Sequence, residues 1–162
     1  MSGAKSPEQA VSELLREKKM TLAAAESCTG GLISKRMTDL SGASRVYHGG
    51  VVSYVNEVKN RVLGVSAETL DRFGAVSAET AAEMAAGVRR VCGSDVGVSV
   101  TGVAGPDKDD RGNEVGTVYV GVATAEKSYV TLLSLSGDRD AIRAAAADRA
   151  LELVRKTMTE LP

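Results

Sequence analysis

The sequence predicts a single layered α/β/α domain with a mixed sheet, and three observations support this fold class. Short apolar runs typical of buried strands alternate along the chain with segments of helical spacing. Two strand-like runs, 116–124 and 128–135, are separated only by Ala125-Glu126-Lys127, which predicts a hairpin and thus antiparallel pairing in part of the sheet. The 162 residues, of which 43% are hydrophobic and 25% charged, suit one soluble globular domain over 1–162.

The first half of the chain supplies a helix, a buried strand and a second helix before an extended segment. Ser6 is a good N-cap, Pro7 suits a first helical turn, and Lys18-Lys19 places positive charge where a helix should end. Gly49-Gly50, inside the extended segment, predicts a bulge or a close approach of two backbones. The predicted ranges are a helix over 6–19, a strand over 21–25, a helix over 32–40 and an extended segment over 45–55.

The second half continues with helices and strands. Ser66 and Ser77 each open the tetrapeptide Ser-Ala-Glu-Thr, and each predicts a helix start with an N-cap and an acidic first turn. We interpret the repeated tetrapeptide as shared capping chemistry rather than as a structural repeat. The predicted ranges are short helices over 56–63 and 66–73, a longer helix over 77–91, a strand over 95–101, the hairpin, and a terminal helix that begins within 137–140.

Composition argues against several classes of function. A net charge of −1 and an aromatic content of 3% give no support for a nucleic-acid partner. The sequence has no long apolar run and no signal-peptide core at its start, so we expect a cytoplasmic protein without membrane contact. Cys28 and Cys92 lie far apart and predict neither a disulfide framework nor a metal site. His48 is the single histidine, so any serine–histidine triad would have to use it.

The stretch from Ala24 to Gly31 is the strongest candidate for a functional site. Ser27 falls at the predicted turn between a strand and a helix, and two glycines, Gly30 and Gly31, follow it. Such a turn directs unpaired backbone N–H groups and the positive end of a helix dipole toward a ligand. A hydroxyl beside such donors suits a nucleophile next to an oxyanion or phosphate site. The alternative is that Ser27 or Thr29 only caps the following helix.

A second glycine-rich turn, Thr101 to Gly105, follows another predicted strand. Neither turn has the Gly-Lys-Ser/Thr ending of a Walker A loop or the spacing of a dinucleotide fingerprint. Glycine after a strand often forms only a turn, so each signal alone is weak. Together the two turns favour one pocket at the ends of neighbouring strands, with a small phosphorylated ligand as its natural occupant.

Several ordered motifs give about 6–154 a specific resemblance to a known family. The motifs are Ala25-Glu26-Ser27-Cys28-Thr29-Gly30-Gly31, Tyr54-Val55-Asn56-Glu57-Val58-Lys59, Gly74-Ala75-Val76-Ser77, Thr101-Gly102-Val103-Ala104-Gly105-Pro106-Asp107, Gly116-Thr117-Val118-Tyr119 and Ser136-Gly137-Asp138-Arg139. In this order they resemble the CinA C-terminal domain family, also called PncC, the nicotinamide-nucleotide amidohydrolases.

The resemblance implies an enzyme that hydrolyses the amide of nicotinamide mononucleotide to nicotinic acid mononucleotide and ammonia. It places the nucleophile at Ser27 and a catalytic lysine at Lys59, with Tyr54 at the family's tyrosine. Val55 stands where relatives carry serine, a departure that leaves Ser27 and Lys59 intact. The family often carries a second, larger domain that this sequence lacks, so the resemblance implies the stand-alone form, assembled as a homo-oligomer such as a dimer.

The implied chemistry needs no metal and no cofactor. A lysine acts as a base only when neutral, and because its ordinary pKa is about 10.4, burial or a nearby cation must lower it. Arg61, Arg139 and Arg143 are the candidates for such a cation. Lys59 would then take the proton of Ser27, and Tyr54 would hold Lys59 or relay the proton. The substrate is a small nucleotide, and the residues expected to bind it are Cys28, Thr29, Gly30, Gly31, Thr101, Gly102, Gly105 and Arg139.

Simpler interpretations of the same residues stay open. Without the resemblance, Lys59 on a surface helix is more often a solvated charge, and Tyr54 at a strand end is more often half-buried packing. Thr101 and Gly102 can simply end a strand. Cys28 can be a nucleophile or a small buried residue. Two other functions also fit: a nucleotide-binding module without turnover, and a hydrolase of another small amide.

Overall fold

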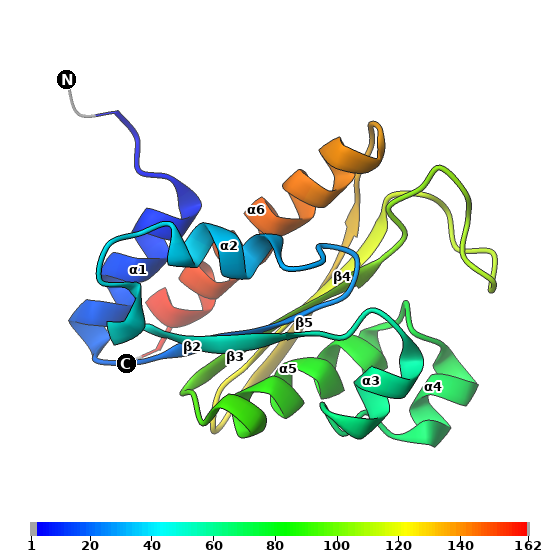
Figure 1. Cartoon of the computed structure of the whole chain (residues 1–162), viewed down its shortest axis with the longest axis horizontal. Helices are drawn as coiled ribbons and strands as arrows, with labels where there is room; N and C mark the ends of the chain where they lie inside the picture. The colour runs from blue at the N-terminus through cyan, green and yellow to red at the C-terminus, as the bar shows by residue number, and fades with distance from the viewer. Residues whose placement is uncertain (1–2, 162) are drawn as a thin grey trace.

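The computed structural model describes residues 3–161, and it confirms the predicted α/β fold with a mixed sheet. A central five-stranded sheet carries helices on both faces (Figure 1). The elements are α1 (Pro7–Lys18), β1 (Leu22–Glu26), α2 (Leu32–Thr38), the short 3-10 helix η1 (Ala43–Arg45), β2 (Tyr47–Val52), α3 (Asn56–Arg61), α4 (Ala67–Phe73), α5 (Ala78–Cys92), β3 (Val96–Gly102), β4 (Thr117–Ala123), β5 (Ser128–Ser134) and α6 (Arg139–Thr159).

The sheet has the strand order β2-β1-β3-β4-β5. β1 pairs in parallel with β2 and β3, whereas β4 runs antiparallel to both β3 and β5. The predicted hairpin is therefore confirmed as the β4–β5 pair. Because β1, β2 and β3 run in one direction, their carboxyl ends meet at the same edge of the sheet, with β1 in the middle. That edge is where open α/β sheets usually bind ligands.

Two helical layers bury the two faces of β1. α1, α2 and α6 lie on one face of the sheet, and α5 lies on the other, with α3 and α4 beside it (Figure 1). Side chains alternate along a strand, so Leu22 and Ala24 join the core beneath α6, while Ala23 and Ala25 join the core beneath α5. Each large aliphatic side chain buried in these cores contributes about 1.5–3 kcal/mol.

Helix starts follow the capping residues that the sequence predicts. Ser6, Ser66 and Ser77 each accept a hydrogen bond from the backbone N–H three residues on, and Asp138 does the same for α6. Each such cap stabilises its helix by about 1 kcal/mol. None of the helices within residues 3–161 combines the length and the apolar character needed to cross a membrane.

The Gly49-Gly50 pair in β2 marks both features predicted for it. The pairing register between β1 and β2 shifts just before Gly49, which makes β2 locally irregular. A Cβ atom on Gly50 would lie 2.6 Å from the carbonyl oxygen of Ala24, too close for any side chain. Glycine at this position therefore lets β2 lie directly against β1.

Candidate active site

Ser27 follows β1 directly, at the middle of the edge where the parallel strands end. Its backbone N–H donates to the carbonyl of Val100 at 3.0 Å, which continues the pairing between β1 and β3. Alternation along the chain directs the Glu26 side chain toward α2 and the Ser27 side chain toward α3. Ser27 is 8% exposed, so the hydroxyl lies at the end of the strand without being sealed from solvent.

Lys59 is the buried partner of Ser27. It lies on α3, yet it is only 1% exposed and is the bulkiest of the fully buried side chains. Its Nζ atom lies 2.9 Å from Ser27 Oγ and 2.6 Å from the carbonyl oxygen of Ser53. Burial lowers the pKa of Lys59 to about 8, because the charged ammonium group loses its water. A neutral Lys59 is therefore accessible close to neutral pH.

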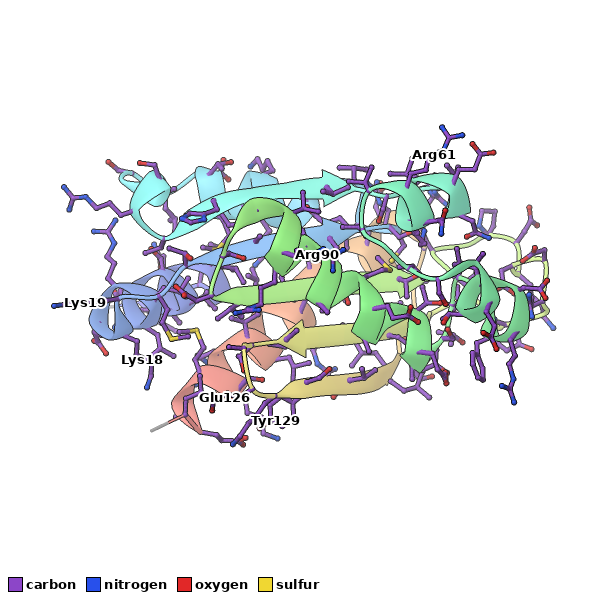
Figure 2. All side chains as sticks on the ribbon, turned by 90° about the horizontal axis from the view of Figure 1, so that it is seen from below. Lys18, Lys19, Arg61, Arg90, Glu126 and Tyr129 are labelled. Atoms are coloured by element: carbon purple, nitrogen blue, oxygen red, sulfur yellow. The ribbon has the colours of Figure 1, made fainter. Side chains whose placement is uncertain are left out.

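Burial, rather than a neighbouring arginine, lowers the pKa of Lys59. Among its neighbours only Cys28 bears on this pKa, and ionisation of its thiol would raise the pKa rather than lower it. Arg61, on the same helix, is exposed and points away from the domain (Figure 2). Arg139 and Arg143, the two other arginines considered as the cation, are bonded to other groups.

The donors and acceptors of the pair allow it to move a proton. A neutral lysine has two N–H donors and one lone pair. One N–H of Lys59 donates to the Ser53 carbonyl, and the lone pair can accept the Ser27 hydroxyl proton over the 2.9 Å contact. Once Lys59 is charged, its Nζ donates to Ser27 Oγ over the same contact. This is the arrangement in which an adjacent base activates a serine nucleophile.

Two glycines build the turn that follows Ser27. Their φ angles are +60° at Gly30 and +109° at Gly31, a region that glycine adopts without strain. The Gly30 N–H donates back to the carbonyl of Ser27. Among the hydrogen bonds within residues 3–161, none uses the backbone N–H of Cys28, Thr29 or Gly31. These groups are the donors that the turn can offer to an anionic ligand.

The backbone N–H groups at the N-terminus of α2 are bound by the Glu26 carboxyl group, although the sequence predicted that they would face a ligand. Glu26 Oε1 accepts the Ile33 N–H at 2.8 Å, and Oε2 accepts the Ser34 N–H at 3.0 Å. The carboxyl group thus takes the positive end of the helix dipole. The role of Glu26 was not predicted from the sequence. An acidic residue at the end of an apolar strand, just before a helix, could have indicated it.

Cys28 points into the core and not toward the site. It packs in the apolar cluster beneath α6, and burial raises the pKa of its thiol to about 11. A thiol with such a pKa stays protonated at neutral pH and is a poor nucleophile, so the geometry favours Ser27. Thr29 is also buried, and its Oγ1 atom has no hydrogen-bond partner in the part of the chain that the structure describes.

Tyr54 is linked to Arg139. Arg139 Nη2 lies 2.9 Å from Tyr54 Oη, and Arg139 Nη1 lies 2.6 Å from the Gly105 carbonyl oxygen. Tyr54 follows β2 and Gly105 follows β3, so this bridge crosses the end of β1, where Ser27 lies. Within residues 3–161 no hydrogen bond joins Tyr54 to Lys59, and Tyr54 is 57% exposed. The predicted contact is absent there, and a catalytic role for Tyr54 stays a prediction.

Arg143 fastens the glycine turn to α6. Its Nε donates to the Cys28 carbonyl at 3.0 Å, and its Nη2 donates to the Thr29 carbonyl at 3.1 Å. The C=O and N–H groups of a trans peptide unit point in opposite directions. Holding the Cys28 carbonyl therefore also directs the Thr29 N–H away from α6. Sequence reasoning considered Arg143 only as a source of charge, because nothing local signals a contact so distant in the chain.

The second glycine turn makes contacts of its own. The Thr101 hydroxyl donates to a backbone carbonyl at 2.7 Å, and a Cβ atom on Gly102 would lie 2.6 Å from the backbone of β4. Gly105 has a φ of +87°, and its carbonyl holds Arg139. The structure gives these three residues roles in packing and turn geometry, and their contact with a substrate stays a prediction.

The rest of the described chain offers a cavity but no metal centre. Within residues 3–161, no group of three or more His, Cys, Asp or Glu side chains could hold a metal ion. A cavity of about 400 Å³ lies between α6 and the β4–β5 hairpin and contains none of the predicted site residues. Thr131 and Leu133 line it from β5, and Arg149, Leu153 and Lys156 line it from α6.

Together the fold and the site define an α/β domain that holds a serine and a buried lysine in contact where its parallel strands end. The family model of the CinA C-terminal domain matches residues 4–158, so the chain belongs to the CinA C-terminal domain family. The family predicted from the sequence motifs is thereby confirmed.

Similar chains occur in bacteria. A CinA-like protein of Geobacter sulfurreducens is 49% identical over 149 residues, which cover 92% of this chain and 36% of that protein. A CinA-like protein of Kosmotoga olearia is 45% identical over 159 residues, which cover 98% of this chain and 39% of that protein. The chain therefore spans little more than a third of the length of these curated relatives.

Solved structures share the whole fold. A crystal structure of a competence-damaged protein (CinA) superfamily protein from Klebsiella pneumoniae superposes with a TM-score of 0.92 at 28% identity, covering 97% of this chain and all of that one (100%). A competence/damage inducible protein from Agrobacterium tumefaciens superposes with a TM-score of 0.88 at 32% identity, covering 99% of this chain and 100% of that one. Each of those crystallised chains thus consists essentially of this domain.

Proposed function

We propose that this protein hydrolyses the amide of nicotinamide mononucleotide to nicotinic acid mononucleotide and ammonia, within cytoplasmic pyridine-nucleotide salvage. The observation that carries the proposal is the 2.9 Å contact between Lys59 Nζ and Ser27 Oγ, made by a lysine whose pKa burial lowers to about 8. A lysine that only solubilised the surface would be exposed, whereas a buried lysine of lowered pKa suits a general base. The choice of substrate follows from the resemblance of the motifs around both residues.

In the first step, neutral Lys59 accepts the proton of Ser27, and Ser27 Oγ attacks the carboxamide carbon on the pyridine ring. A C–O bond forms while the carbonyl electron pair moves to oxygen. The N–H groups of Cys28, Thr29 and Gly31 are the donors available to this oxyanion. A donor of this kind is typically worth about 3–4 kcal/mol in the transition state.

In the second step the tetrahedral intermediate collapses and its C–N bond breaks. Charged Lys59 gives its proton to the departing nitrogen, which leaves as ammonia. A water molecule then loses a proton to neutral Lys59 and attacks the acyl-enzyme, which releases the acid and restores Ser27. One base serves both halves of the reaction, and His48, which contacts the Cys92 carbonyl instead, takes no part.

The remainder of the nucleotide would lie along the rim between the loops that follow β2 and β3. Arg139 is an exposed cation on this rim, and a guanidinium group is well matched to phosphate oxygens. Tyr54 offers an exposed aromatic ring on the same rim. We therefore include Arg139 as the phosphate-binding residue in the proposal, with Thr101, Gly102 and Gly105 shaping the side of the rim that follows β3.

Ammonia release from nicotinamide mononucleotide by the purified protein tests the proposal. Release that Ser27→Ala abolishes would support it. Release from other small amides but not from the nucleotide would instead favour a hydrolase of another amide on the same scaffold. If no ammonia is released at high enzyme concentration while calorimetry shows that the nucleotide binds, the protein is a binding module and the proposal is wrong.

A further inference from the structure

Glu26 is a fully buried acid that the proposed reaction does not use. It is 0% exposed, and both of its carboxyl oxygens accept hydrogen bonds from the start of α2. Oε2 accepts a further bond from the Ser34 hydroxyl at 2.7 Å. A buried carboxyl group is tolerated only when its oxygens are satisfied in this way. Its side chain thus fixes the helix that follows the glycine turn.

The backbone of Glu26 fixes the other half of the site. Its carbonyl oxygen accepts the Ser53 N–H at 2.8 Å, and the Ser53 hydroxyl lies 3.5 Å from the same oxygen. The Ser53 carbonyl in turn accepts a hydrogen bond from Lys59 Nζ at 2.6 Å. Glu26 is therefore connected to both reacting groups. It directly precedes Ser27 in the chain, and its carbonyl holds Ser53, to which Lys59 is hydrogen-bonded.

We propose that Glu26 is a positioning residue that sets the distance between Ser27 Oγ and Lys59 Nζ and the orientation of the glycine turn. Its side chain acts through α2 and its backbone carbonyl through Ser53, and neither touches the substrate. The proposal rests on the proposed function for its main readout, and a second readout below does not depend on nicotinamide mononucleotide.

The hydrogen-bond pattern requires a carboxyl group of this length. Because the Ile33 and Ser34 backbone groups are donors, both oxygens at position 26 must accept. A glutamine would turn one of its N–H groups toward a backbone N–H, and an aspartate would be one methylene too short to reach both. Since the Ser34 hydroxyl donates to Glu26, it must accept from Tyr47, which lies 2.6 Å away. Burial raises the pKa of Tyr47, which keeps the proton that this bond needs.

Loss of the hydrogen bonds between Glu26 and α2 should slow the chemical step. A displacement of about 1 Å in a reacting group can cost about 100-fold in rate. We expect Glu26→Gln to lower kcat by about 100-fold while KM changes by less than about threefold, because the residue orients reacting groups and binds no substrate.

The experiment compares wild type, Glu26→Gln, Glu26→Asp and the matched control Glu79→Gln, an exposed glutamate in the first turn of α5. Circular dichroism and thermal unfolding establish that each variant is folded at the assay temperature. Glu79→Gln should keep wild-type kcat and KM. A folded Glu26→Gln with wild-type kcat overturns the inference, while the proposed function stands.

A substrate-independent readout separates the inference from the proposed function. p-Nitrophenyl acetate can acetylate Ser27: a bond forms from Oγ to the acetyl carbon, the bond to p-nitrophenolate breaks, and Lys59 receives the serine proton. Acetylation that is slower in Glu26→Gln than in wild type, with Ser27→Ala as the blank, supports the inference even if nicotinamide mononucleotide is not hydrolysed. Equal rates in both proteins overturn it. A wild type that neither releases ammonia nor acetylates above the blank overturns both.

Discussion

Ser27 Oγ and Lys59 Nζ lie 2.9 Å apart although 32 residues separate them in the chain. The serine ends β1 and the lysine belongs to α3, which follows β2. The second hydrogen bond of Lys59, to the Ser53 carbonyl, ties the lysine to the segment that leaves β2. Any change that moves β2 relative to β1 therefore changes the distance between the two side chains.

Replacing Lys59 by methionine should abolish activity without lowering the stability of the fold. Methionine has a similar length and no charge, so Ser27 loses its base while the apolar packing is kept. We expect ammonia release to fall at least about 1,000-fold, as in other hydrolases that lose the base of a serine nucleophile. Scanning calorimetry at pH 7 should show unfolding at or above the wild-type temperature, because a buried ammonium group is costly. Lys156→Met, at an exposed position of α6, should leave activity unchanged.

The lowered pKa of Lys59 predicts how activity and stability depend on pH. Only neutral Lys59 can accept the serine proton, so kcat should rise with pH through about 8 and level off above it. The unfolded chain holds this proton up to its ordinary pKa of 10.5, so between about 8 and 10.5 the unfolded state binds more protons. The free energy of unfolding of wild type, relative to Lys59→Met, should therefore increase with pH across this window. Urea unfolding at several pH values measures the difference, and a constant difference would contradict the assignment.

Arg143→Ala should lower both stability and kcat, although Arg143 does not take part in the reaction. The change removes two hydrogen bonds from a charged donor to the Cys28 and Thr29 carbonyls, so the glycine turn loses its attachment to α6. We expect a loss of about 1–3 kcal/mol in the free energy of unfolding. We also expect kcat to fall by about 10–100-fold, because the oxyanion donors are no longer held. Arg149→Ala, on an exposed position of the same helix, serves as the control and should change neither quantity appreciably.

Tyr54→Phe asks whether the tyrosine takes part in proton transfer. The change removes the hydroxyl that Arg139 holds and keeps the ring. Because this hydroxyl bonds to Arg139, we expect KM for the nucleotide to change more than kcat, with kcat staying within about tenfold of wild type. A residue that transfers protons contributes about 100–10,000-fold. A loss of kcat in that range, with KM unchanged, would place Tyr54 in the proton relay.

Gly50→Ala tests the close approach of β2 to β1. The new Cβ atom would lie 2.6 Å from the Ala24 carbonyl oxygen and 2.9 Å from both Ser34 Oγ and Tyr47 Oη. Since backbone atoms cannot yield cheaply, we expect a loss of about 1–3 kcal/mol in the free energy of unfolding, measured by urea denaturation. Gly3→Ala is the control, because nothing lies within 4 Å of the position that its methyl group would take. Equal stabilities of the two variants would contradict the close approach.

Much of the fold was predictable because its signals are local. N-caps such as Ser6 and Ser77, the glycines that follow Ser27, and the short link between β4 and β5 all act over a few residues. The sequence also predicts that Ser27 ends a strand before a helix, which the structure confirms. The family followed from several motifs in a fixed order, and the match of the family model confirms it.

The arrangement of the site was harder to predict because it depends on contacts that are distant in the chain. The burial of Lys59 depends on the position of α3 in the fold, which brings its side chain to Ser27 after β1. The sequence of this short helix, in which half of the residues are charged, shows no sign of that burial. Glu26 was missed because its partners are backbone N–H groups, which every sequence has. Tyr54 was expected to hold Lys59 or relay its proton, but its hydroxyl is bonded to Arg139 instead.

The attachment of the glycine turn by Arg143 has a consequence for the order in which the molecule assembles. Arg143 lies 115 residues after Cys28 and 114 residues after Thr29. During synthesis, Ser27 and Lys59 therefore leave the ribosome long before α6, whose Arg143 holds the glycine turn. Contacts between such distant segments form late, because closing a long loop costs entropy before any contact compensates it. A nascent chain carries its nucleophile while the turn beside it is still free, and the site becomes complete only when α6 docks.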